Sequence, residues 1–255
     1  MILILFGVGV VAQVVTTPDG SLGDHDSISW AWGLGVTLGI YTAARLSGAH
    51  LNPAVTIALA AFKGFEWKKV APYCAAQTLG AFTAAMIVRF VYADLIKAVD
   101  PNLTKTQTIF STLPGNGTPD TPVSITTTFF DQIVGTAILV FVVFALTTAT
   151  NNPPLGNIGP LMVGLLVVGI GMAWGANAGY AINPARDFGP RLASWITGYE
   201  TAWSVPQTGY PYWWVPIVAP IIGGLIGGAL FKFAIEMHIP EDESTEDPVV
   251  SEPTK

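Results

Sequence analysis

Long apolar runs, separated by short polar segments, are the dominant pattern along this chain. Each run is close to the roughly 20 residues that an α-helix needs to cross the hydrocarbon core of a bilayer. The runs therefore predict membrane-spanning helices near Ile28–Leu46, Val70–Tyr92, Thr127–Thr147, Ile158–Ala176 and Trp213–Ile235.

The first apolar run, Met1–Val15, is shorter than the others. At 1.5 Å per residue it covers about 22 Å of a hydrocarbon core that is roughly 30 Å thick. A signal peptide is the alternative, but the segment lacks a basic beginning and a small-residue cleavage pattern. We interpret it as a span without its beginning, and we expect the natural protein to have a longer cytoplasmic N-terminus.

Two further apolar segments begin with the same tripeptide, as Asn52-Pro53-Ala54 and Asn183-Pro184-Ala185. Asn is a favoured N-cap and Pro suits the first helical position, so each copy predicts the start of a helix. A single Asn-Pro more often marks a turn, but duplication in matching surroundings favours the helix start. About ten residues follow each copy before the next break, which predicts re-entrant half-helices instead of full spans.

The two tripeptides belong to an internal repeat with an offset of 131 residues. The same offset pairs Gly33 with Gly164 and Gly48 with Gly179. Three spans in each half place the second half in the membrane upside down relative to the first. The two half-helices then approach the middle of the bilayer from opposite faces, with Asn52 and Asn183 at their tips. Each tip carries the positive end of a helix dipole, so the pair repels cations.

The predicted fold class is an all-α membrane protein with six transmembrane helices, the first of them shortened, plus two re-entrant half-helices in an inverted repeat. The membrane domain is expected to cover residues 1–238, with repeats of approximately 1–110 and 125–238. Residues 239–255 are acidic and are predicted to be a disordered tail.

Composition and charge support a place in the bilayer. Hydrophobic residues make up 51% of the chain and charged residues 11%, whereas soluble domains have about 25% charged residues. Lys63, Lys68 and Lys69 cluster after the first half-helix and predict that this side is cytoplasmic. The long segment 93–124 then lies outside as a loop. It contains two N-glycosylation sequons, of which Asn116 is better placed than Asn102 because it lies in a Pro/Gly-rich turn.

Catalytic and metal-binding patterns are absent from the sequence. His25, His50 and His238 are widely separated, and no CxxC, HExxH or phosphate-binding glycine loop occurs. Cys74 is the single cysteine and lies in an apolar span. We therefore predict that the protein is not an enzyme, and we expect no metal, no cofactor and no nucleic-acid partner.

The segments around the two tripeptides, residues 47–55 and 179–190, resemble the twin NPA pore signatures of the aquaporin family. The second segment is especially similar to that of the glycerol-conducting branch, the aquaglyceroporins. The resemblance extends from Met1 to about His238. It implies an aquaporin-like channel domain with a pore through every protomer, and assembly as a homotetramer in the lipid bilayer.

The resemblance also implies a selectivity filter built from Trp32, Gly171, Tyr180 and Arg186. An Arg near the bilayer midplane is tolerated only beside water or polar groups, which independently places Arg186 at a pore. Gly171 occupies the position where water-selective relatives typically carry His, so the opening is expected to be wider and to admit a three-carbon polyol. Further positions that match the glycerol branch are Tyr92, Asp187, Arg191, Pro216 and Ile217.

Extended strands before the two tips are expected to present backbone carbonyls to the pore. The residues concerned are Gly48, Ala49, His50, Gly179, Tyr180 and Ala181. Members of the family often anchor these loops with Glu in the first and fourth spans. In the fourth span this chain has Gln132, next to Asp131, and we expect its amide to accept the same hydrogen bond.

The resulting hypothesis is a passive channel for glycerol and other small uncharged solutes together with water, which excludes ions and protons. We expect it to lie in the plasma membrane with both termini cytoplasmic. Three alternatives are a water-selective aquaporin, an inverted-repeat secondary transporter and a non-conducting scaffold. By the same resemblance Asp187 favours the glycerol branch, because water-specific members generally carry a small residue there. Asp187 can also pair with Arg191 one helical turn later, as structural support.

Overall fold

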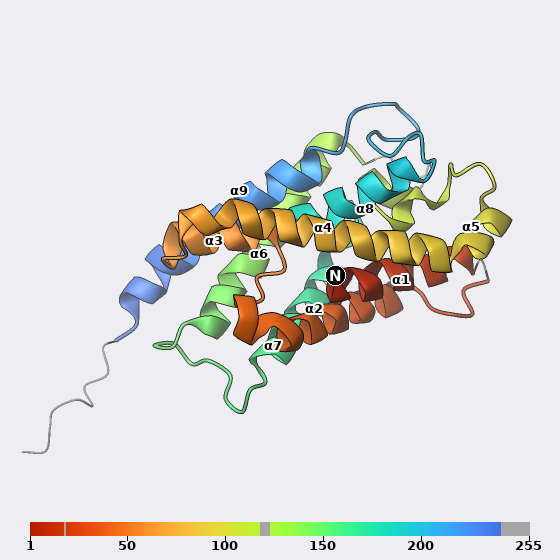
Figure 1. Ribbon diagram of the computed structural model, residues 1–255. Helices are drawn as coiled ribbons and strands as arrows, with labels where there is room; N and C mark the ends of the chain where they lie inside the picture. Colours follow the sequence, from red (N-terminus) through yellow and green to blue (C-terminus); the bar gives the residue numbers. More distant parts are fainter. Residues whose placement is uncertain (18, 118–122, 241–255) are drawn as a thin grey trace, which may run out of the picture.

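The computed structural model describes residues 1–17, 19–117 and 123–240. This part of the chain is helical, without any named β-strand. Long helices occur at all six predicted spans, and the two half-helices also form (Figure 1). The long helices are α1 (Ile2–Thr16), α2 (His25–Ser47), α4 (Trp67–Val91), α6 (Ile125–Thr147), α7 (Gly159–Trp174) and α9 (Val215–Ala234). The half-helices are α3 (Pro53–Phe62) and α8 (Pro184–Ile196). The predicted fold class is thus confirmed.

The packing follows the internal repeat. Half-helix α3 packs against α9 of the second repeat, and half-helix α8 packs against α4 of the first. Helices α2 and α7, which the 131-residue offset relates, also lie against each other. At their contact a Cβ on Gly33 would lie 2.5 Å from the Gly164 carbonyl oxygen, and a Cβ on Gly164 would lie 2.6 Å from the Gly33 carbonyl oxygen. The related glycines therefore let the two halves of the molecule approach each other closely.

Glycines in α9 allow a close contact with α6. A Cβ on Gly223 would lie 2.3 Å from the carbonyl oxygen of Ile133, and one on Gly227 would lie 2.2 Å from that of Ala137. Both carbonyls belong to α6. Any side chain at these glycines would push α9 away from α6, the helix that it contacts most extensively.

Helix boundaries differ from the predictions by a few residues. Helix α2 starts at His25 because the Asp24 side chain accepts hydrogen bonds from the backbone N–H groups of Asp26 and Ser27. Half-helix α8 has 13 residues, more than the ten expected. By length and composition, three helices of the described chain can cross a membrane: Trp67–Val91, Ile125–Thr147 and Val215–His238. Helices α1 and α7 are apolar but shorter.

The segment 93–124, predicted as a loop, is more ordered than expected. It contains α5 (Ala93–Val99) and the short 3₁₀ turns Thr106–Ile109 and Pro114–Gly117. Asp100 organises its beginning, because its carboxylate accepts hydrogen bonds from the backbone of Thr104, Lys105 and Thr106. Burial acts to raise the pKa of Asp100, but these hydrogen bonds stabilise the carboxylate and hold its pKa below the ordinary value.

The same segment reverses the expected order of the two sequons. The Asn116 amide donates hydrogen bonds to the carbonyls of Gly175 and Ala176, which occupies the nitrogen that glycosylation needs. Asn102 is exposed, so the structure favours it instead. Residues 118–122, which include the last sequon position, lie outside the described residues, as do residues 241–255 of the predicted tail.

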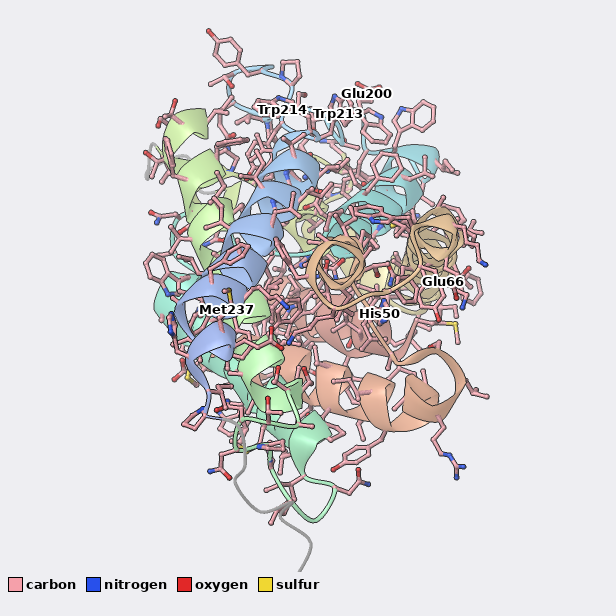
Figure 2. All side chains as sticks on the ribbon, turned by 90° about the vertical axis from the view of Figure 1, so that its left-hand side faces the viewer. His50, Glu66, Glu200, Trp213, Trp214 and Met237 are labelled. Carbon is pink, nitrogen blue, oxygen red and sulfur yellow. The ribbon has the colours of Figure 1, made fainter. Side chains whose placement is uncertain are left out.

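Lys63, which follows α3, connects the end of this half-helix to the ends of α6 and α9. Its ammonium donates to Thr148 and to Glu236, at 2.8 Å and 2.5 Å. It also lies about 5 Å from the ring centroids of Phe144 and Phe231. In the view of Figure 2, Glu200, Trp213 and Trp214 lie near the top, and Met237, which follows Glu236 directly, lies well below them.

Candidate functional site

The two half-helices meet tip to tip, and each tip is capped by the predicted asparagine. The Asn52 side-chain oxygen accepts from Ala54 N, while its nitrogen donates to the carbonyl of Ile182 at 2.8 Å. The Asn183 oxygen accepts from Ala185 N, and its nitrogen donates to the carbonyl of Leu51 at 2.9 Å. The asparagine of each repeat therefore binds the backbone just before the asparagine of the other repeat. Because a carboxamide nitrogen has two N–H groups, one remains on each asparagine.

The backbone before each tip is not the extended strand that the sequence predicts. Ala49 and Leu51 have φ angles of 47° and 55°, and their repeat-related partners Tyr180 and Ile182 have 29° and 42°. Such values are unfavourable for non-glycine residues, above all for β-branched Ile182. The reciprocal asparagine bonds stabilise this conformation in both loops.

A cavity of about 440 Å³ lies beside the two tips. Its lining includes Asn52 and Asn183, Trp32 and Arg186, and Thr147 and Pro160. The loop residues Gly48, Ala49, His50, Tyr180 and Ala181, all predicted to line a pore, also border it. Gly171 and Gly179 are not among the described residues that line it.

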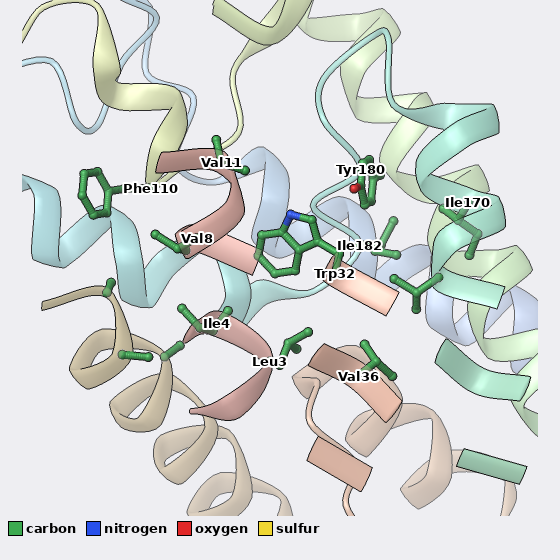
Figure 3. Close-up of a cluster of buried hydrophobic side chains, with 14 of the residues drawn as sticks. Leu3, Ile4, Val8, Val11, Trp32, Val36, Phe110, Ile170, Tyr180 and Ile182 are labelled. Carbon is green, nitrogen blue, oxygen red and sulfur yellow. The ribbon is translucent and has the colours of Figure 1, made fainter. Parts of the chain in front are cut away.

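Trp32 and Arg186 come together as predicted. The guanidinium carbon of Arg186 lies 4.0 Å from the Trp32 ring centroid, and both residues are buried. Within the described chain, the Trp32 indole nitrogen has no hydrogen-bond partner. The structure therefore places donor groups of both side chains and one aromatic face at the same part of the cavity. Figure 3 shows the Trp32 ring beside Tyr180 and Ile182.

Gly171 affects this part of the cavity indirectly. A Cβ built on it would lie 2.8 Å from Tyr180 Cζ and 2.8 Å from Ser29 Oγ. The Tyr180 ring thus occupies the space that a side chain at residue 171 would need. The sequence predicts that glycine widens the opening directly, whereas in the structure Gly171 does not line the cavity and instead leaves room for the Tyr180 ring, which does.

His25 is a residue of this site that the sequence analysis missed. Its Nε2 atom lies 2.9 Å from the Gly171 carbonyl oxygen, and its ring meets the Tyr180 ring edge-on at 6.3 Å between centroids. His25, Ser29 and Trp32 follow one another at helical spacings of four and three residues, so they share one face of α2. This spacing could have predicted that His25 lies on the same side of α2 as Trp32.

Asp187 and Arg191 form the predicted pair inside half-helix α8. Arg191 Nε donates to Asp187 Oδ1 at 2.7 Å, and both side chains are fully buried. The second Asp187 oxygen accepts from the backbone and hydroxyl of Thr112, and Arg191 donates to the carbonyls of Thr112 and Ala202. The pair therefore anchors α8 to the segments that contain Thr112 and Ala202, and it does not border the cavity.

Gln132 makes the loop contact that the sequence predicts. Its side-chain oxygen accepts from Ile182 N at 2.9 Å, and it is fully buried. In the other loop, His50 Nδ1 lies 3.1 Å from Thr56 Oγ1, and its ring packs on Phe65 and Tyr73. His50 therefore has the bonded, packed surroundings of a structural histidine. Among the described residues, no three His, Cys, Asp or Glu side chains gather as a metal site.

Comparison with known proteins gives consistent similarities. The major intrinsic protein family profile matches residues 1–231. The chain is 44% identical over 243 residues to the probable aquaglyceroporin-2 of Gibberella zeae, covering 92% of this chain and 69% of the relative. It is 45% identical over 246 residues to aquaglyceroporin-9 of Botryotinia fuckeliana, covering 92% of this chain and 51% of the relative. The chain thus spans about half the length of the Botryotinia protein.

A bacterial relative and a solved structure match over nearly their whole length. The chain is 40% identical over 263 residues to the glycerol uptake facilitator protein of Pseudomonas aeruginosa, covering 100% of this chain and 91% of the relative. The X-ray structure of the aquaglyceroporin from Plasmodium falciparum superposes with a TM-score of 0.82 and 32% identity, covering 93% of each chain. The similarity to these two proteins therefore includes both repeats.

Proposed function

The chain belongs to the major intrinsic protein family, and we propose that it is a passive channel that conducts glycerol and other small uncharged solutes together with water. The observation that supports this most is the cavity beside the paired Asn52 and Asn183 caps, with Trp32 and Arg186 together at one part of it. The named relatives, aquaglyceroporins and glycerol uptake facilitators, support the choice of solute.

Glycerol has hydroxyl groups along one edge and C–H groups along the other. The rings of Trp32 and Tyr180 suit the carbon edge, while Arg186 donates to the hydroxyl edge. The free N–H of each asparagine donates to a hydroxyl or to water at the middle of the passage. Backbone carbonyls of the loops accept from the same hydroxyls, so selectivity comes from matching an amphipathic solute.

Cations and protons are repelled by positive potential. The N-termini of α3 and α8 each present roughly half a positive charge where they meet. Arg186 adds a full charge near one of them. A cation that enters loses water without finding a carboxylate, because no Asp or Glu is among the described residues that line the cavity.

The alternatives are less well supported. A water-selective pore is disfavoured by Gly171 and by the Asp187–Arg191 pair, which both match the glycerol branch. A secondary transporter needs an ion-binding or titrating carboxylate at the midplane, and the described cavity lining offers none. A non-conducting scaffold would leave the cavity at the two asparagines without a role.

Further parts of the proposal concern the assembly and the membrane. We propose a homotetramer in the plasma membrane with both termini cytoplasmic, on the basis of family membership and of the position of Lys63, Lys68 and Lys69. Large apolar side chains on the outside, such as Leu79, Phe90 and Leu230, provide surface for lipid or for neighbouring protomers.

Stopped-flow light scattering on vesicles tests the proposal. Vesicles that contain the purified protein are expected to shrink in a glycerol gradient and then to reswell much faster than empty vesicles. Fast shrinkage without accelerated reswelling would identify a water-selective pore. Shrinkage and reswelling at the rates of empty vesicles would rule out a channel for either molecule.

A further inference from the structure

The Gln132 side chain uses both ends of its amide inside the protein. Its oxygen accepts from Ile182 N at 2.9 Å, and its nitrogen donates to Asp131 Oδ2 at 3.2 Å. The other oxygen of Asp131 accepts from the Asn177 amide at 3.0 Å. Asp131 is 7% exposed and Gln132 is fully buried. Three consecutive polar contacts therefore run from the external loop to the turn at the half-helix tip.

The chemistry of these contacts fixes the orientation of the Gln132 amide. A backbone N–H can only donate, so the group that faces Ile182 N must be the oxygen. The amide nitrogen then points to Asp131, whose carboxylate can only accept. A rotated amide would place two donors together at Ile182 and two acceptors together at Asp131. An amide, unlike a symmetric carboxylate, needs a neighbour to select one orientation.

We infer that Asp131 is a positioning residue of the pore, which sets the Gln132 amide and through it the turn at Ile182. Ile182 adopts a φ of 42°, and its carbonyl accepts from the Asn52 amide on the opposite tip. Displacing Ile182 therefore displaces an asparagine that lines the cavity. The inference rests on the proposed function, because it assigns Asp131 a role in the geometry of that passage.

A specific dependence between residues 131 and 132 follows. Glu in place of Gln132 could still accept from Ile182 N, as the resemblance indicates for many family members. In this chain its second oxygen would face Asp131 Oδ2, and two carboxylates so close repel each other strongly. With Asp131→Asn in addition, the amide introduced at position 131 can donate to the new carboxylate and accept from Asn177. Positions 131 and 132 thus need one carboxylate and one amide, in either order.

The test is a double-mutant cycle read by glycerol flux per folded channel and by water flux. Gln132→Glu alone is expected to reduce glycerol flux by at least roughly tenfold, because a buried like-charge pair forces the turn apart. Asp131→Asn alone is expected to cost about threefold or less, since the half-buried Asn177 amide can rotate to compensate. The double variant Asp131→Asn/Gln132→Glu is expected to recover to within about threefold of the parent.

Controls separate the possible failures. Gln207→Glu adds the same charge in an exposed loop and is expected to leave flux unchanged. Gln132→Glu with parental flux, or a double variant no better than Gln132→Glu, would overturn the inference. If Gln132→Glu does not fold, the yield of folded protein replaces flux as the readout. Folded protein in the double variant would then support the inference, and its absence would overturn it. If the parent itself does not conduct glycerol, the proposed function fails, and the unfolding temperatures of the four proteins then test the pairing.

Discussion

A channel that carries Gly171→His is expected to lose at least about nine-tenths of its glycerol flux and to keep most of its water flux. Gly171 has no room for a side chain, because even a Cβ would lie 2.8 Å from Tyr180 Cζ and from Ser29 Oγ. The imidazole must therefore displace the Tyr180 ring toward Trp32 and Arg186. Narrowing this part of the cavity excludes a three-carbon solute before it excludes water.

Swelling assays in glycerol and in an impermeant osmolyte measure the two fluxes of this variant separately. Gly169→His is a matched control on the same helix, because a Cβ at Gly169 meets nothing within 4 Å. The control is expected to conduct like the parent. Unchanged glycerol flux in Gly171→His would refute the assignment of this residue to the filter, whereas loss of both fluxes would indicate a collapsed passage.

Replacing Asp187 by Ala is expected to destabilise the folded protein by about 3–5 kcal/mol, because it leaves the Arg191 guanidinium buried without its counter-charge. The backbone and hydroxyl of Thr112 also lose their acceptor. Asp187 lies in the first turn of half-helix α8, next to the Asn183 cap, so loosening it also disturbs the tip. The change therefore affects folding first and conduction as a consequence.

Thermal unfolding of the detergent-solubilised protein measures this loss. Asp187→Asn keeps an acceptor for Arg191 and is expected to fall between the parent and Asp187→Ala. Asp94→Ala removes a carboxylate in α5, outside the buried pair, and is expected to leave the unfolding temperature unchanged. Equal unfolding temperatures for Asp187→Ala and the parent would show that the buried pair does not stabilise α8.

Local sequence signals were sufficient for the helices and for the tips. Apolar runs mark the spans because lipid requires a continuous apolar surface, and each Asn-Pro marks a helix start because capping is decided within three residues. The Asp187–Arg191 pair was predictable for the same reason, since both residues lie on one face of one helix. The family resemblance carried by these motifs is confirmed by the match over residues 1–231.

Features that depend on contacts between distant segments could not be predicted. The space beside Gly171 is filled by Tyr180 only after α7 and the second loop have packed, and the His25 contact to Gly171 joins residues 146 positions apart. The turn Pro114–Gly117 is held by Asn116, whose amide binds the carbonyls of Gly175 and Ala176, 59 and 60 positions further along the chain. The positive φ angles of Leu51 and Ile182 likewise depend on asparagines from the opposite repeat.

The central claim, that solutes pass through the cavity at the two asparagine caps, is tested most directly by blocking that cavity chemically. Val163 lines it, and Leu165, two residues further along α7, is 38% exposed on the outside. In a Cys74→Ser background, Val163→Cys treated with a bulky thiol reagent is expected to lose glycerol and water flux together, and to regain both on reduction. Leu165→Cys with the same treatment is expected to conduct normally. Full conduction by the labelled Val163→Cys protein would contradict the account.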